Sequence, residues 1–418
     1  MSRRFSSRKL ILFFVLLIST IFLQCSKNPV STQSKVPFEP TATEKRLIKS
    51  DNKFGLKLFK EIIKEEKNKN VFISPLSVSM ALGMTYNGAN GTTREAMQKT
   101  LELNDLTIQE VNESYKSLTE SLTQLDPKVK FQIANSIWYR RSLTPEAEFI
   151  NLNKTYFDAL VSGLDFNDPN AAKIINAWVE ENTHGKIKQI VDDPIDPMIL
   201  MFLINAIYFK GTWTYEFDKD LTKDDWFYLT DGSRKSCKMM EQRSLYRHLS
   251  NDDFEAVDLP YGDEDFSMTI FLPNHDTEVD SLIVKFDQES YNYWLSCFKS
   301  DSGNIYLPKF KLEYKLQLND ALKALGMGIA FSPAADFSKM YKDVGVWIDQ
   351  VIHKTFLQVD EEGTEAAAVT VVTMTTSAGP GNSSDFEMRV DRPFVFVIRE
   401  NHSQTILFIG KIVDPTFE

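Results

Sequence analysis

The sequence predicts an α+β fold, built as one domain with large and mostly antiparallel sheets. Helical and strand patterns are interspersed along the chain without the regular alternation of a βαβ protein, and long strand candidates dominate the second half. No Pro/Gly/Ser-rich linker divides the body after residue 44. The 418 residues, 43% of them hydrophobic and 25% charged, are enough to bury a large core.

The first residues differ in character from the body. An apolar run of 14 residues, from Leu10 to Leu23, is too short for a comfortable transmembrane helix but typical of a signal peptide. It follows the basic residues Arg3, Arg4, Arg8 and Lys9. We therefore expect residues 1–24 to be a signal peptide.

Cys25 directly follows the apolar run and resembles the lipidated cysteine of a bacterial lipoprotein. Phe22-Leu23-Gln24 lacks the small residue that most such signals carry, so plain cleavage to a soluble secreted protein is the alternative. Residues 25–43, rich in Ser, Thr, Pro and Lys, predict a flexible tether before a body at 44–418. We expect export to the cell surface, periplasm or extracellular space, with membrane contact only through this lipid.

Charge and motifs exclude several function classes. Removing residues 1–24 deletes four positive and no negative charges, which takes the net charge from -11 to -15 and argues against a nucleic-acid partner. There is no Gly-x-Ser-x-Gly, His-Glu-x-x-His or Walker motif, and the five histidines lack metal-ligand spacing. We therefore expect that the protein is not an enzyme and that it binds no cofactor or metal ion. Cys237 and Cys297 could form one bridge, but two unpaired, mostly buried thiols are the expectation.

Helices are predicted mainly in the first half of the body. Apolar residues recur at helical spacing within residues 44–67, and 171–182 is amphipathic. Ser74-Pro75 predicts the start of a buried helix, and Thr92-Thr93-Arg94-Glu95 predicts a capping box for the next. Strands are predicted at Phe131–Tyr139, Met198–Lys210, Thr269–Leu272, Ile305–Leu307, Trp347–Val359, Phe394–Arg399 and Ile406–Ile412.

The stretch from Asp360 to Thr376 is unusual. From Thr364 onward eight of its 13 residues are Val or Thr and none is Pro or Gly, which favours a strand, yet it runs into loop-like residues 377–384. An ordinary strand with a polar hairpin tip is one interpretation. The other is a strand that can enter a closed sheet without burying a charge, since Glu365 lies on the opposite face. The uncharged face carries Thr364, Ala366, Ala368, Thr370, Val372 and Met374.

Residues 361–368, Glu-Glu-Gly-Thr-Glu-Ala-Ala-Ala, resemble the hinge of inhibitory serpins. Further segments at 70–77, 205–213 and 307–310, with the pair 391–396 and 406–411, resemble other parts of that family in the same order. Together they cover almost the whole mature chain, which is thereby identified as a member. The resemblance implies a monomeric single domain with about three β-sheets, eight to nine helices and an exposed reactive-centre loop at about 363–390.

The resemblance implies inhibition of a serine protease by a suicide-substrate mechanism. The protease cleaves the loop, the freed strand inserts into the sheet called A, and the acyl-enzyme is trapped. Small residues in the hinge favour an inhibitory member over a non-inhibitory surface carrier, and a solute-binding lipoprotein is favoured only by the N-terminus. The implied hinge residues are Glu361, Glu362, Gly363, Thr364, Glu365, Ala366, Ala367, Ala368 and Thr370.

The family's usual spacing from the hinge implies a reactive bond at Ser377-Ala378. Because the loop is a few residues longer than usual, Met374-Thr375 and Thr376-Ser377 are alternatives. No Lys or Arg occurs between residues 364 and 388, so proteases with an acidic primary pocket are disfavoured. The expected target is elastase-like, or failing that chymotrypsin- or subtilisin-like.

Four further residues have roles that the resemblance implies. Ser77, Asn205 and His353 match the shutter beneath the centre of the sheet, and we expect the histidine and the asparagine to satisfy each other's hydrogen bonds. A satisfied core histidine is the plainer interpretation. Trp213 matches the breach where insertion starts, with a plain core tryptophan as the alternative.

Overall fold

The computed structural model describes residues 38–364 and 385–417, within which it has nine α-helices and three short 3₁₀ or π segments. The α-helices are α1 (Ala42–Glu65), α2 (Pro75–Tyr86), α3 (Gly91–Thr100), α4 (Ile108–Gln124), α5 (Ala147–Phe157), α6 (Ala171–Asn182), α7 (Val279–Val284), α8 (Gln288–Cys297) and α9 (Asn319–Leu322). The short segments are η1 (Lys219–Leu221), η2 (Lys323–Met327) and η3 (Gly328–Phe331).

A six-stranded sheet carries most of the candidate site. Its order is β10 (Phe310–Gln317), β11 (Ile352–Asp360), β12 (Gly363–Thr364), β4 (Met201–Thr212), β2 (Val129–Arg140) and β3 (Leu160–Leu164). All neighbouring pairs are antiparallel except β2 and β3. Among the described residues, the two-residue strand β12 is the only link between β11 and β4.

The second sheet has nine strands and is organised around β6 (Arg234–Ser250). This 17-residue strand pairs with β5 (Lys223–Tyr228) at its start, with β9 (Lys299–Pro308) along its middle and with β7 (Phe254–Tyr261) at its end. It therefore joins two layers into one sheet, and the expected three sheets form two. The remaining strands are β8 (Phe266–Pro273), β13 (Phe386–Arg389), β14 (Phe394–Glu400), β15 (Ile406–Ile412) and β1 (Val71–Ile73).

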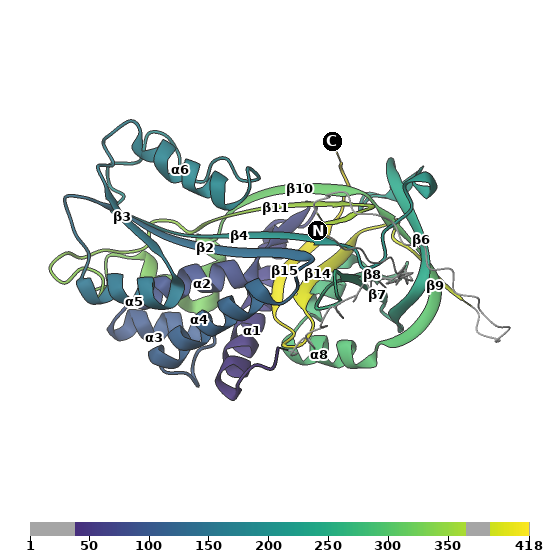
Figure 1. Cartoon of the computed structure of the whole chain (residues 1–418), viewed down its shortest axis with the longest axis horizontal. Coiled ribbons are helices and arrows are strands. Elements are labelled where there is room, and N and C mark those ends of the chain that lie inside the picture. The colour runs from purple at the N-terminus through teal and green to yellow at the C-terminus, as the bar shows by residue number, and fades with distance from the viewer. Residues whose placement is uncertain (1–37, 365–384, 418) are drawn as a thin grey trace, which may run out of the picture. The chain divides into compact units, whose positions relative to one another are not determined.

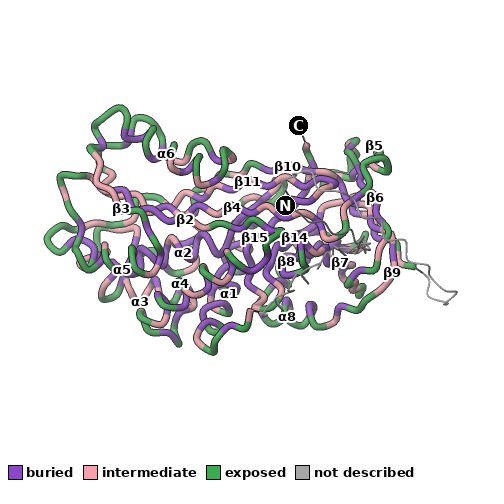
Figure 2. Tube along the Cα trace, viewed as in Figure 1, coloured by how far each residue is buried: buried purple, intermediate pink, exposed green. Residues whose placement is uncertain are grey.

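The six-stranded sheet is covered on both faces. Figure 1 shows α6 on one side of β2 and β4, and α2 with its neighbouring helices on the other. Trp138 on β2, Ile204 on β4 and Ile175 on α6 belong to a separate apolar cluster between this helix and the sheet. Helix α2 is buried along nearly its whole length, as its lack of charged residues predicts. Figure 2 shows the continuous burial of β14 and β15, and β15 is in contact with α2.

The α+β prediction is confirmed, and several boundaries differ from the sequence prediction. Helix α1 begins at Ala42, inside the segment assigned to the tether, because the Thr41 hydroxyl and the Glu44 carboxylate form a capping box there. Helix α3 begins at Gly91 without any side-chain cap, so the box predicted at 92–95 is wrong. Strand β11 begins at Ile352 rather than at residue 347.

Within residues 38–364 and 385–417, no helix combines the length and apolar character that a membrane span needs.

Candidate functional site

The hinge enters the six-stranded sheet at the open end between β11 and β4. Gly363 and Thr364 lie opposite Asp360 and Val359 on one side, and opposite Thr212 and Gly211 on the other. Thr364 is 1% exposed, and its hydroxyl lies 2.5 Å from the Tyr261 hydroxyl in the core. The side chain of Thr364 therefore faces inward, and Gly363 and Thr364 form a two-residue central strand of the sheet.

Gly363 occupies a position that only glycine fits. Its φ of 147° lies in the range that L side chains rarely adopt, and a Cβ there would lie 2.1 Å from the carbonyl oxygen of Gly211. The close approach of the two glycine backbones is what allows the chain to turn from β11 into the gap beside β4. A side chain at Gly363 would push the strands apart, and one at Gly211 would meet the Tyr261 ring at 2.8 Å.

Two carboxylates anchor the turn before the hinge. Glu361 accepts hydrogen bonds from Lys309 Nζ at 2.7 Å and from the Thr222 hydroxyl at 2.8 Å. Burial raises the pKa of Glu361, but these hydrogen bonds and the Lys309 charge outweigh burial and hold that pKa below its usual range. Glu362 forms an ion pair with Lys219. The turn is thus held by two ion pairs, from Glu361 to Lys309 and from Glu362 to Lys219.

Trp213 lies directly under this turn. Its backbone N–H donates to the Glu362 carbonyl and its indole Nε1 donates to the Asp360 carbonyl, each at 2.9 Å. The ring stacks on Tyr261 with centroids 4.4 Å apart and is 4% exposed. Trp213 is both a core residue and a contact of the hinge, and its role as the place where insertion starts stays a prediction.

His353 lies deeper in the sheet, on the inward face of β11. Its Nε2 accepts a hydrogen bond from the backbone N–H of Ser74 at 2.9 Å, at the start of α2. Nε2 must therefore be unprotonated. Burial lowers the pKa of His353 to about 4, which keeps the ring neutral at physiological pH.

Asn205 makes a different contact from the expected one. Its Nδ2 donates to Oδ1 of Asn135 at 2.7 Å, and Asn135 in turn donates to the Phe157 carbonyl. His353 and Asn205 do not bond each other, so the expectation of a mutual hydrogen bond is wrong for this structure. Oδ1 of Asn205 is buried and has no partner among the described residues.

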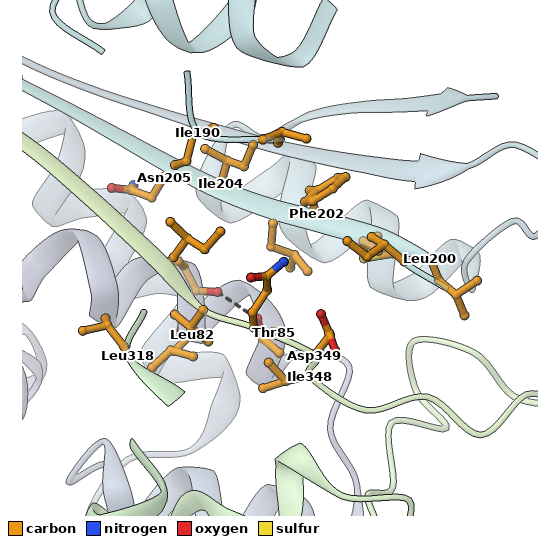
Figure 3. A pocket seen from close by; sticks show the side chains of 18 of the residues that line it. Leu82, Thr85, Ile190, Leu200, Phe202, Ile204, Asn205, Leu318, Ile348 and Asp349 are labelled. Carbon is orange, nitrogen blue, oxygen red and sulfur yellow. Dashed lines mark hydrogen bonds between the residues drawn. The ribbon is translucent and has the colours of Figure 1, made fainter. Parts of the chain in front are cut away.

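A cavity of about 420 Å³ separates the first halves of β4 and β11. Its floor is α2, which contributes Ser77, Leu82 and Thr85, and its far wall is the segment 345–351. Figure 3 shows Leu200, Phe202 and Ile204 among the side chains that line it. The lining is mostly apolar, and Asn205 and His353 lie at the end nearer to β12. The shutter residues predicted from sequence therefore meet around one space.

Several sequence-predicted residues lie outside the described part of the chain. They are Cys25, Glu365, Ala366, Ala367, Ala368, Thr370, Met374, Thr375, Thr376, Ser377 and Ala378. The described part of the chain holds no group of three His, Cys, Asp or Glu side chains that could bind a metal ion. Cys237 and Cys297 are both free.

Sequence reasoning missed most of the residues that contact the hinge and the shutter. Lys309 lies in the quoted segment 307–310, but nothing there indicates a carboxylate partner 52 residues away. Tyr261, Thr222 and Asn135 carry no sequence signal at all. Ser74 was recognised as a helix cap, which it is, but not as the donor to His353.

Comparison with known proteins places the whole described body in one family. The model described as "Serpin (serine protease inhibitor)" matches residues 49–415. Iripin-8 from Ixodes ricinus is 37% identical over 88% of this chain and 93% of its own length, and leukocyte elastase inhibitor from Sus scrofa is 32% identical over 88% and 100%. Human thyroxine-binding globulin superposes with a TM-score of 0.82 at 30% identity, covering 90% of this chain and 100% of that one.

Proposed function

The chain belongs to the serpin family, and from this premise we propose that it inhibits serine proteases as a suicide substrate. Members of this family are not catalytic enzymes. Many of them inhibit serine proteases, and some have no inhibitory activity. In the proposed reaction the protease serine attacks a carbonyl of the loop and expels the C-terminal segment as an amine. The N-terminal segment remains esterified to the protease and inserts between β4 and β11 before water hydrolyses the ester.

The observation that carries the proposal is an entrance occupied by β12, above a stretch of β4 and β11 that no described strand joins. Gly363 and Thr364 already pair with both neighbours, while no described pairing joins β4 to β11 beyond them. The gap continues into the cavity of about 420 Å³. A strand that extended β12 would pair with the backbone groups of β4 and β11 on both of its sides, which gives insertion a driving force.

Extending the observed register tests whether the loop sequence suits the gap. Thr370 lies six residues after Thr364, while Asn205 and His353 lie six residues before Gly211 and Val359. Insertion would thus place residue 370 between the two shutter residues. An even offset from Thr364 points the side chain inward. Its hydroxyl could donate to the unpartnered Oδ1 of Asn205.

The target specificity rests on the loop sequence. No Lys or Arg lies between residues 364 and 388, which disfavours proteases whose primary pocket contains an acid. We propose Ser377-Ala378 as the bond and an elastase-like or chymotrypsin-like target. The similarity to leukocyte elastase inhibitor supports an elastase-like target.

Export, lipid attachment at Cys25, a monomeric state and a bacterial source are also proposals. They rest on the residues at the N-terminus and on the family resemblance. The relatives reported above come from a tick, a pig and a human, so they lend no support to a bacterial source.

The test is to incubate purified protein with pancreatic elastase, chymotrypsin and trypsin and to separate the products on denaturing gels. We expect a band at the summed mass with elastase or chymotrypsin, and a released peptide that starts at Ala378. A peptide that starts at Thr375 or Ser377 would keep the mechanism and move the bond. Cleavage without a stable complex by all three proteases, or potent trapping of trypsin within 370–385, would contradict the proposal as stated.

A non-inhibitory carrier is the second candidate, favoured by the similarity to thyroxine-binding globulin. A carrier would bind a ligand that stabilises it and would be cleaved without trapping the protease. A solute-binding lipoprotein, favoured only by the N-terminus, would show the same ligand-dependent stabilisation.

A further inference from the structure

We propose that the outer face of β6 around Leu245 is a second contact site for the target protease, separate from the cleaved loop. The proposal rests on the proposed inhibitory function and deepens it. The protease would bind this face of the sheet in the encounter complex, while its active site engages the loop. The face consists of Arg243, Leu245 and Arg247 on β6 and Ser302 on β9.

Leu245 is exposed on one face of β6, and the opposite face of the strand is packed against other side chains. Its side chain is 64% exposed, whereas the next residue, Tyr246, is 3% exposed and packs with its ring against Phe386. Phe386 also stacks on His248 at 3.9 Å and covers Gly303. The inner face is therefore covered at these residues, and the outer face is the one on which Leu245 can meet a partner.

Strand register places Leu245 beside the point where the loop rejoins the sheet. Leu245 lies opposite Ser302, and Phe386 lies beside Gly303 in the parallel pair of β9 and β13. Asp385, one residue before Phe386, therefore lies in the row of Ser302 and Leu245. Two strand spacings separate Leu245 from Asp385, or about 10 Å between Cα atoms. An ion pair between Arg243 and Asp385 crosses this same outer face.

The short chain between the reactive bond and Asp385 limits where the protease can lie. From residue 378 to residue 385 is seven residues, which span at most about 25 Å when fully extended. A protease of about 250 residues has a radius of gyration of about 18 Å, so its body is at least about 36 Å across and wider than that reach is long. A protease engaged on the bond consequently overlies the surface around Asp385, and Leu245 projects from that surface.

The composition of this face suits a protein partner. The side chains of Arg243 and Arg247 are 60% and 48% exposed, and they flank Leu245 two residues away on either side. Arginine beside a central apolar group is typical of the residues that dominate protein–protein binding energy. Arg243 bonds Asp385 and Arg247 bonds Asp258, so both heads are held in place before the partner arrives. The complementary protease surface would offer an apolar side chain and a carboxylate.

The test compares Leu245→Glu and Leu245→Ala with Val284→Glu as the matched control. Val284, on α7, is 73% exposed and lies in a different part of the sequence and fold. The association rate constant is measured with the elastase or chymotrypsin that the unaltered protein traps. Hydrolysis of a synthetic peptide spanning residues 366–384 by the same protease gives the rate for the loop alone. Thermal unfolding of each variant checks folding, and Leu245→Ala covers the case in which the glutamate disturbs the strand.

We expect Leu245→Glu to lower the association rate constant about tenfold and Leu245→Ala about threefold. The control should stay within twofold, and the unaltered protein should react faster than the peptide. Unchanged rates in both Leu245 variants, with trapping intact, would overturn this inference and leave the proposed function standing. Failure of the unaltered protein to trap any protease would overturn both.

Discussion

Replacing His353 by glutamine should remove an acid sensitivity that the native histidine builds into the fold. In the folded chain burial lowers the pKa of His353 to about 4, whereas an unfolded histidine titrates near 6.5. Between these values the unfolded state binds the extra proton and the folded state does not. The stability contributed by His353 is therefore complete above pH 6.5 and is lost as the pH falls toward 4.

The magnitude follows from the two pKa values. Full protonation of the unfolded state against a neutral folded state costs about 3.4 kcal/mol, of which about 2 kcal/mol is reached at pH 5. Protonation of Nε2 also removes the acceptor of the Ser74 N–H, so the lost hydrogen bond and the buried charge act in the same direction. Glutamine offers a neutral oxygen to the same N–H at every pH.

The assay is urea unfolding of the native and His353→Gln proteins at pH 7.5 and pH 5, followed by tryptophan fluorescence. The native protein should lose about 2 kcal/mol more than the variant on acidification, equivalent to about 0.7 M urea for a slope of about 3 kcal/mol/M. Equal losses in the two proteins would refute the assignment of a buried, neutral His353. Other titrating groups cancel in the comparison.

A companion variant tests the same residue as a support of the sheet. His353→Ala leaves the buried Ser74 N–H without its acceptor, at a cost of about 1–3 kcal/mol. We expect this loss to promote latent or polymerised forms on mild heating. Size-exclusion chromatography that shows an unchanged monomer fraction would count against this role.

Three further predictions follow from the same site and its support. Thr370→Arg should turn the inhibitor into a cleaved substrate, because insertion would bury a cation in the shutter; undiminished complex on a denaturing gel would contradict the register. Glu361→Gln should cost about 1–3 kcal/mol through loss of the Lys309 ion pair, and an unchanged urea midpoint would argue that the turn is held by other contacts. Burial raises the pKa of Asp51 to about 7, although the hydrogen bond from Tyr115 acts in the opposite direction. Asp51 therefore stays protonated to a higher pH in the folded chain than in the unfolded chain, and the free energy of unfolding falls as the pH rises from about 4 to 7. Asp51→Asn should abolish about 4 kcal/mol of this fall in unfolding titrations, and a parallel fall in both proteins would contradict it.

The sequence predicted the elements whose own pattern determines them. Helix α6 was bounded correctly, because its amphipathic period is unbroken and Gly185 follows its end. The start of α2 was correct because Ser74 and Pro75 act locally, as N-cap and first residue. The central strand β4 was found from its apolar run, with its start misplaced by three residues.

Other elements depend on contacts that the sequence does not display. Strand β5 carries Asp224, Asp225 and exposed Trp226, and only its pairing with β6 makes it a strand. The start of β11 was placed too early because Trp347 is apolar but lies in a loop, 46% exposed. At the site, the family resemblance indicated His353 and Asn205, but their partners come from Ser74 and Asn135 on other elements.

The most direct test of the central claim is the thermal unfolding of the protein before and after a single cleavage in the loop. If residues after Thr364 fill the gap between β4 and β11, the cleaved form should unfold at least about 10 °C higher, since each kcal/mol gained is worth about 2–4 °C in a domain of this kind. An unchanged or lower unfolding temperature after cleavage would show that the gap does not accept the strand, and would contradict the inhibitory mechanism.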